Sequence, residues 1–449
     1  MGISIHGREI DLLTRTHNTS ELSNQIGKEV IVSGWVHDVR ALGGINFIVL
    51  RDSEGIVQVT ASKKDASKEI LKIVEKLHQE DVISVKGKVV KSKIAKIGIE
   101  ILPEKIEIVS KAESPLPLDP RWVTPANLDT RLEWRSLDLR RKENLAIFKI
   151  QSKLQEGMEE CLKSQGFLRV WTPSILGGTS EGGSEVFKIN FFDKDAFLRQ
   201  DPQLHRQLLI AGGFDKVYDL GPSWRAEPSD QPTHLAEHRT IAPEFAFMMD
   251  ESDMMKLEQE TCVAGIKKVI SDCEKELKII GKEIEVPKLP FPEIRFPKIY
   301  EILEENGKNL SRVSDLDRES EKILSNYIKE KHKHDFFFVN RFPFAAKPFY
   351  VMRVDEEPEW ARSVDLMFKG LEISSGGQRE HRYEKIIQQI KEKKMNATVL
   401  KWFTEVFKYG VAPHGGFSLG IERFTMKLLD LSNIKEAVLF PRYITRMLP

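Results

Sequence analysis

The sequence has few cysteines, no long apolar segment and no excess charge of either sign. Its three cysteines lack the paired spacing of a zinc site, so we expect reduced thiols and neither disulfides nor bound zinc. No segment reaches the roughly 18 consecutive apolar residues of a membrane span, and the first ten residues are too polar for a signal peptide. These absences predict a cytoplasmic protein with no membrane association.

The charges cancel, with 68 basic and 68 acidic residues, which argues against a protein that coats nucleic acid indiscriminately. A local basic surface is nevertheless present, because residues 61–96 contain ten lysines and five acids. Such a segment is typical either of a nucleic-acid contact or of a solvated surface. The length of 449 residues predicts two to four domains, and 41% hydrophobic residues suffice for large cores.

The N-terminal part, residues 1–112, alternates apolar and polar residues in four or five short runs that are interrupted by one helical stretch. This pattern predicts a small OB-type β-barrel, a fold that binds single-stranded nucleic acid by aromatic stacking and backbone charge. Four residues are candidates for its binding face, although a core or surface role is an equal alternative for each one: Trp35, His37, Phe47 and Gln58.

A proline-rich segment, SPLPLDP from Ser114 to Pro120, predicts a domain boundary, and we expect a hinge over residues 113–140. Apolar residues at helical spacing then predict a helix over 143–164. Residues 141–449 contain mostly adjacent strand-like runs and helices, which predicts an α+β domain built on an antiparallel sheet. Within it, residues 250–335 are expected to form a helical insertion of unknown role.

Residues 218–247 contain Trp224-Arg225-Ala226-Glu227 at the end of an apolar run, followed by a turn-rich loop and a second apolar run. An arginine with a nearby acid and a loop is typical of nucleotide handling. Residues 176–188 hold four glycines but no following Gly-Lys-Ser/Thr, so they are not a Walker loop. A glycine-hinged lid and an ordinary flexible loop are the two interpretations.

Three spaced motifs occur along the chain: the helix and strand that end at Pro173, the strand-loop-strand around Arg225, and GIERF from Gly420. A fourth, GLEISSGGQREHR, begins at Gly370. With these motifs almost the whole chain resembles the class II aminoacyl-tRNA synthetases of the aspartate, asparagine and lysine subgroup, most closely the archaeal-type aspartyl-tRNA synthetases. The resemblance implies an anticodon-binding OB domain, a hinge and a class II catalytic domain.

The resemblance also implies the reaction. An amino-acid carboxylate attacks the α-phosphorus of ATP, and the resulting adenylate acylates the terminal ribose of tRNA. Two anions must approach each other, so catalysis depends on positioning and charge neutralisation. By analogy with the family, Arg225 and Arg423 are catalytic, because an arginine fork cannot lose its proton.

Further roles follow from the resemblance alone. The ATP-binding residues are Arg225, Glu227, His234, Glu372, Gly420 and Arg423. The amino-acid-binding residues are Glu181, Gln203, Arg206, Ser375 and Arg379, of which Arg379 pairs with the side-chain carboxylate of aspartate. The Mg²⁺ ligands are Asp365 and Glu372, with a surface salt bridge as the alternative. The tRNA anticodon contacts are Trp35, His37, Phe47, Gln58 and Lys96.

The chain departs from the family pattern at a cluster of positions. Arg206 stands where a lysine is usual, Asp201 replaces a serine, and Ala242 replaces an acid. We hypothesise that Asp201 supplies the charge for the substrate ammonium that Ala242 cannot give. A loop arginine is replaced by Thr233, and Arg239 replaces an aromatic residue, so we also hypothesise that Arg239 stacks on adenine.

The resemblance therefore predicts an ATP- and Mg²⁺-dependent aspartate–tRNA ligase that forms a homodimer through the helix before Pro173. Activation of asparagine or of another amino acid is the first alternative, because the departures lie in the substrate pocket. A non-enzymatic RNA-binding regulatory protein is the second. Charging of tRNA-Asn besides tRNA-Asp stays open, because His37 is similar to relaxed members of the family and Lys96 to strict ones.

Overall fold

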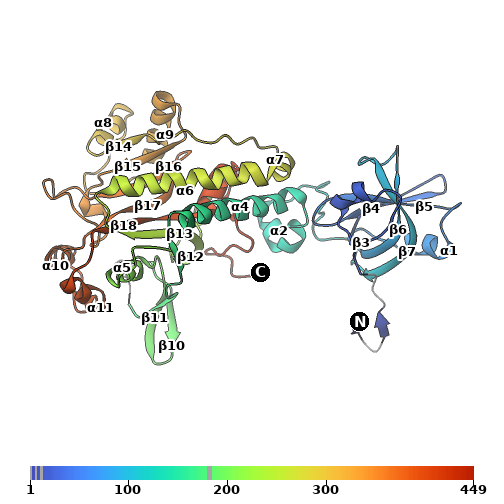
Figure 1. Ribbon diagram of the computed structural model, residues 1–449, viewed down its shortest axis with the longest axis horizontal. Helices are drawn as coiled ribbons and strands as arrows, with labels where there is room; N and C mark the ends of the chain where they lie inside the picture. Colours follow the sequence, from blue (N-terminus) through green and yellow to red (C-terminus); the bar gives the residue numbers. More distant parts are fainter. Residues whose placement is uncertain (1–2, 6–7, 11–13, 179–184) are drawn as a thin grey trace. The chain divides into compact units, whose positions relative to one another are not determined.

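The computed structural model describes residues 3–5, 8–10, 14–178 and 185–449. The chain divides into two compact units, Met1–Lys142 and Glu143–Pro449 (Figure 1). The proline-rich segment and the expected hinge over 113–140 therefore belong to the first unit. That segment carries two short helices, α2 (Leu128–Glu133) and α3 (Arg135–Asp138).

The first unit contains a closed five-stranded barrel in the order β3-β4-β5-β7-β6, which confirms the predicted OB-type fold. Its strands are β3 (Glu29–Leu42), β4 (Ile45–Arg51), β5 (Ile56–Ser62), β6 (Val82–Lys91) and β7 (Ile99–Ser110). Helix α1 (Lys68–Val74) lies between β5 and β6 in the chain. Alternate residues such as Val32, Val36, Ile48 and Val59 are fully buried, so the barrel encloses its own core.

The second unit is built on an eight-stranded sheet in the order β14-β15-β16-β17-β18-β13-β12-β8. Its strands are β8 (Leu168–Val170), β12 (Lys216–Trp224), β13 (Glu237–Ala246), β14 (Glu293–Arg295), β15 (Phe336–Asn340), β16 (Ser363–Phe368), β17 (Leu371–Arg379) and β18 (His414–Gly420). The central pairs are antiparallel, as predicted, but both edge pairs, β14 with β15 and β12 with β8, are parallel. The sheet is therefore mixed, and the unit is α+β.

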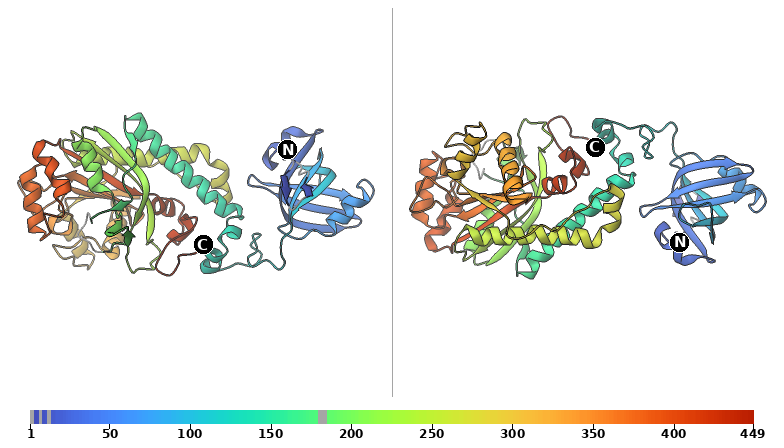
Figure 2. Two further views of the ribbon diagram at one scale, coloured as in Figure 1. Left: turned by 90° about the horizontal axis from the view of Figure 1, so that it is seen from below. Right: turned by 90° about the horizontal axis from the view of Figure 1, so that it is seen from above.

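Two long helices, α4 (Lys142–Ser164) and α6 (Glu251–Asp272), lie side by side against one face of this sheet (Figures 1 and 2). Leu154 and Met158 of α4 share a core with Ile266 of α6 and with sheet residues such as Ile241 and Phe417. Strand side chains alternate between faces, so the neighbours of these core residues point to the other face of the sheet. That other face carries the candidate site.

The region 250–335 differs from the helical insertion that we expected. Its first helices, α6 and α7 (Glu274–Ile280), contribute to the main core, and β14 joins the edge of the sheet. Helices α8 (Lys298–Glu305) and α9 (Arg318–His332) pack with residues of β14, β15 and β16 in a second, smaller core, with Leu303 and Ile328 among its buried residues. The region is therefore part of the catalytic scaffold. Among the described residues, no helix is long and apolar enough to cross a membrane.

Candidate active site

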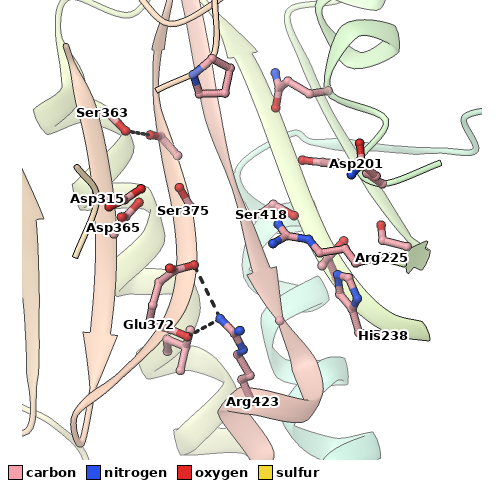
Figure 3. A pocket seen from close by; sticks show the side chains of 18 of the residues that line it. Asp201, Arg225, His238, Asp315, Ser363, Asp365, Glu372, Ser375, Ser418 and Arg423 are labelled. Carbon is pink, nitrogen blue, oxygen red and sulfur yellow. Dashed lines mark hydrogen bonds and ion pairs between the residues drawn. The ribbon is translucent and has the colours of Figure 1, made fainter. Parts of the chain in front are cut away.

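An open pocket of about 300 Å³ lies on the sheet face opposite α4 and α6. Its walls come from β12, β13, β16, β17, β18 and α12 (Ile421–Leu428). Figure 3 shows Asp201, Arg225 and His238 on one side and Asp365, Glu372 and Ser375 on the other. Residues as far apart in the chain as Asp201 and Ser375 therefore face one cavity.

Arg225 follows the last residue of β12, so the strand aims its side chain into the pocket. Its Nη1 atom lies 3.3 Å from Oε1 of Glu227, and Oε2 of Glu227 lies 3.5 Å from Nε2 of His234. Burial and the positive charge of Arg423 lower the pKa of His234, so its imidazole is neutral at pH 7. The three residues form one half-exposed polar wall.

Strand β13 points the side chains of the neighbouring residues His238 and Arg239 in different directions. His238 and Thr240 line the pocket, whereas the guanidinium of Arg239 lies 3.4 Å from Glu422 and 3.1 Å from Glu237. Burial, with the charge of Arg225 next, lowers the pKa of His238 to about 3, so this ring is neutral. Arg239 does not line the pocket and its stacking on adenine stays a prediction, whereas the neighbouring ring of His238 faces the pocket. The alternation of β13 would have distinguished the two positions.

The opposite wall carries carboxylates. Asp365 accepts a hydrogen bond of 3.1 Å at Oδ2 from Nζ of Lys347, which also donates to Asp315 at 3.0 Å. Burial raises the pKa of Asp365 to about 7. The positive charge of Lys347 opposes this shift, and the negative charge of Glu372 adds to it. Neither Lys347 nor Asp315 was predicted, because both lie outside the motifs. Asp315 comes from the loop before α9.

The two acids fit a hard cation. Oδ1 of Asp365 is buried and has no hydrogen-bond partner among the described residues, and the carboxylate of Glu372 faces the same pocket. The described residues contain no cluster of three or more His, Cys, Asp or Glu that could hold a metal on its own. A cation here would need further oxygen ligands from a bound molecule or water.

Arg423 and Gly420 close the base of the pocket. Gly420 ends β18 and immediately precedes α12, which carries Arg423. Nη1 of Arg423 donates to the carbonyl oxygen of Glu372 at 3.0 Å and lies 3.7 Å from its Oε1 atom (Figure 3). An arginine and an acid that both reach the pocket are therefore held together by the β18–α12 turn.

A buried network forms the inner end of the pocket. Arg379 donates to Oε1 of Glu244 at 3.1 Å and to Oε1 of Gln203 at 2.8 Å. Arg206 donates to the same Gln203 oxygen at 2.6 Å and to both carboxylate oxygens of Asp201 at 2.7 and 3.1 Å. Gln203, Asp201 and Arg379 line the pocket, whereas Arg206 lies behind the lining that the described residues form. Glu244, which was not predicted, joins the two arginines.

The structure thus brings most predicted catalytic-domain residues to one cavity, and Ser375 and Gly420 also line it. Glu181 lies outside the described residues. The predicted tRNA contacts belong to the other unit: Trp35, His37, Phe47 and Gln58 are half-buried on the outer face of the barrel, and Lys96 is exposed between β6 and β7.

Comparisons with known protein families assign both units. Residues 127–444 match the family described as tRNA synthetases class II (D, K and N), and residues 30–109 match the OB-fold nucleic acid binding domain. The chain is 46% identical over 438 residues to an aspartate–tRNA(Asp) ligase of Pyrococcus horikoshii, covering 97% of this chain and all of that protein. It is 42% identical to an aspartate–tRNA(Asp/Asn) ligase of Methanopyrus kandleri, over 94% of this chain and 96% of that protein.

Solved structures agree. Asparaginyl-tRNA synthetase from Pyrococcus horikoshii, complexed with asparaginyl-adenylate, has a TM-score of 0.90 at 31% identity and covers 98% of this chain and 100% of its own. A putative aspartyl-tRNA synthetase from Leishmania major also has a TM-score of 0.90, at 28% identity, with 98% of this chain and 97% of that chain covered.

Proposed function

We propose, because this chain belongs to the class II tRNA synthetases of the aspartate, lysine and asparagine group, that it is an ATP-dependent ligase that joins aspartate to tRNA. The observation that carries the proposal is one pocket that collects Arg225, Glu227, His234 and Arg423 beside the buried Arg379. Cationic groups for phosphates and a cationic group for a carboxylate are the two requirements of aspartate activation.

Arg225 performs the central electrostatic task. In activation, a carboxylate oxygen of aspartate forms a bond to the α-phosphorus, and the bond from that phosphorus to the bridging oxygen of pyrophosphate breaks. Negative charge gathers on the α-phosphate and the attacking carboxylate at the same time. Arg225 is half-exposed at the end of β12, and its planar guanidinium can contact both groups while Glu227 restrains one of its nitrogens.

The remaining phosphate contacts surround this position. Arg423, held by the backbone of Glu372, faces the outer phosphates and the nucleotide. His234 lines the same pocket, and its ring N–H can donate a hydrogen bond to a phosphate oxygen. Glu227 accepts from the adenine edge, and Gly420 leaves room for the nucleotide at the β18–α12 turn. Asp365 and Glu372 would hold Mg²⁺, which when bound neutralises phosphate charge as a Lewis acid.

Gln203, Ser375 and Arg379 form the amino-acid end of the pocket in this proposal: Gln203 and Arg379 are hydrogen-bonded in the buried network, and Ser375 lines the pocket beside Asp365 of the neighbouring strand. The side-chain carboxylate of aspartate would contact Arg379. Glu181, by resemblance, would approach the substrate ammonium. In the second half-reaction the terminal ribose hydroxyl of tRNA attacks the adenylate carbonyl and AMP leaves, so tRNA must reach the same open pocket.

The barrel supplies the tRNA-binding surface of the proposal. Trp35, His37, Phe47 and Gln58 share its outer face, and Lys96 adds positive charge from an exposed loop. Aromatic and basic groups on an OB barrel suit single-stranded anticodon bases. The relatives named for both tRNA(Asp) and tRNA(Asn) make charging of tRNA-Asn a second candidate activity.

A homodimer is part of the proposal. Strand β8 is the edge of the eight-stranded sheet, and the nearby side chains of Leu168 and Trp171 are exposed. An exposed apolar edge next to α4 is the kind of surface that a second copy covers. A monomer mass by light scattering would contradict it. A cytoplasmic location stays a prediction.

The test is amino-acid-dependent exchange of pyrophosphate into ATP, run with each of the twenty amino acids. We expect exchange with aspartate alone, and Arg225→Lys should reduce its kcat on the order of 10²-fold because a bidentate contact is lost. Exchange with asparagine or another amino acid would assign a different substrate. If no amino acid supports exchange, the result favours a non-enzymatic RNA-binding protein. Charging of tRNA-Asp and tRNA-Asn transcripts then decides the tRNA range.

A further inference from the structure

Asp201 pairs with the terminal nitrogens of Arg206, and this contact affects which amino acid the pocket selects. Its two carboxylate oxygens accept hydrogen bonds of 2.7 and 3.1 Å from Nη1 and Nη2 of Arg206. Resting on the proposed function, we infer that Asp201 is a specificity-determining residue: it neutralises Arg206, leaves Arg379 alone to bind the substrate side chain, and thereby weakens the preference for aspartate over asparagine.

Burial supports this assignment. The side chain of Arg206 is 0% exposed and lies behind the pocket lining, whereas the side chain of Asp201 is 22% exposed and lines the pocket. Burial alone would raise the pKa of Asp201, but the charge and hydrogen bonds of Arg206 outweigh it and lower that pKa. Asp201 is thus ionised and stands between Arg206 and any ligand.

The donors of the two arginines are used differently. Both terminal nitrogens of Arg206 are engaged by Asp201 and Gln203, and its Nε atom lies 3.7 Å from Oε2 of Glu244. Arg379 uses Nε and Nη2 for Glu244, Gln203 and the carbonyl oxygen of Gly416. Its Nη1 atom makes no hydrogen bond to the described residues. Nε of Arg206 has no hydrogen-bond partner among the described residues, but Arg206 is fully buried and does not line the pocket, so a substrate carboxylate reaches a donor on Arg379 and not on Arg206.

The charges of this end of the pocket cancel. Arg206 and Arg379 contribute two positive charges, and Asp201 and Glu244 contribute two negative ones. Nearby His414 is neutral, because burial lowers its pKa to about 4. Removing the charge of Asp201 leaves one net positive charge, which favours aspartate over the neutral asparagine. The competing hypothesis, that Asp201 holds the substrate ammonium, affects both amino acids alike because both carry that ammonium.

The variant Asp201→Asn distinguishes the specificity role of Asp201 from the competing role in binding the substrate ammonium. The variant keeps size and one acceptor for Arg206, and Glu244 remains as a counter-charge, so the fold should be retained. We expect the ratio of kcat/KM for aspartate to that for asparagine, measured by ATP–pyrophosphate exchange, to rise on the order of tenfold. Calorimetric Kd values for both amino acids give the same ratio without turnover. An unchanged ratio, or equal weakening of both amino acids, overturns the inference.

The double variant Asp201→Ala/Arg206→Met provides the second comparison, since it removes both charges together. We expect its aspartate-to-asparagine ratio to stay within about threefold of the wild-type ratio. A large fall in that ratio would show that Arg206 itself contacts the substrate, and would overturn the inference. Failure of the proposed function looks different, because then the unmodified protein shows no aspartate-dependent exchange and no aspartate binding.

Discussion

At the scale of single residues, His414 links the site to acid stability. It is fully buried at the start of β18, with Nδ1 2.8 Å from the carbonyl oxygen of Ala412 and Nε2 3.2 Å from Gln207. Burial lowers its pKa from 6.5 to about 4. Between those values the unfolded chain binds a proton that the folded chain does not, so the free energy of unfolding falls as pH drops from 6.5 to 4.

The prediction is that His414→Gln has a flatter stability profile than the unmodified protein. From pH 7 to pH 5 the unmodified protein should lose on the order of 2 kcal/mol more than the variant, because glutamine cannot take up the proton. Urea unfolding at several pH values measures this difference. Parallel profiles for the two proteins would show that His414 does not titrate in this way.

The site residues that the sequence predicted are those whose chemistry depends on one short motif. Arg225, Glu227 and Arg423 lie in the pocket because strand ends or turns hold them. Lys347, Asp315 and Glu244 were missed, because their ion pairs depend on which distant segments the fold brings together. His238 could have been found, since it alternates with Arg239 on β13.

At the scale of elements, α4 and α6 approach closely at Gly157 of α4 and Gly265 of α6. A Cβ atom added to Gly157 would lie 2.5 Å from Cβ of Lys268 and 2.8 Å from the carbonyl oxygen of Ala264. Gly157→Ala should therefore destabilise the second unit by about 1–3 kcal/mol, because the helices must separate. Thermal or urea unfolding measures the loss.

Ser152→Ala is the matched control for this contact, because Ser152 is exposed on the same helix. It should change the free energy of unfolding by less than about 0.5 kcal/mol. Equal stability of Gly157→Ala and Ser152→Ala would mean that the two helices can separate without cost.

Periodic elements were the easiest to predict. The helix expected over 143–164 is α4, Lys142–Ser164, since its apolar residues repeat at helical spacing. Within the apolar segment 349–354, Val351 and Arg353 form only isolated bridges and no strand. Conversely, prolines around residues 287–297 hid β14, which pairs on one side only and so tolerates them at the sheet edge. In both segments, pairing with distant strands determined whether a strand forms.

At the scale of the whole molecule, the two compact units divide the proposed reaction. Every residue proposed for ATP or amino acid lies in Glu143–Pro449, and every residue proposed for the anticodon lies in Met1–Lys142. The sequence predicts this division, because short strand-like runs precede the proline-rich segment and the domain that carries the motifs follows it. Adenylate formation should therefore be insensitive to changes on the barrel.

Phe47→Ala tests this division. Phe47 is half-buried on the outer face of β4, next to the fully buried Ile48 of the barrel core, so its ring can be removed without opening that core. Loss of one base–aromatic stack costs about 1–3 kcal/mol, so kcat/KM for aminoacylation of tRNA-Asp should fall on the order of tenfold. Exchange of pyrophosphate into ATP without tRNA should stay within about twofold of the unmodified rate. Equal losses in both assays would show that the barrel surface supports activation and does not serve tRNA binding alone.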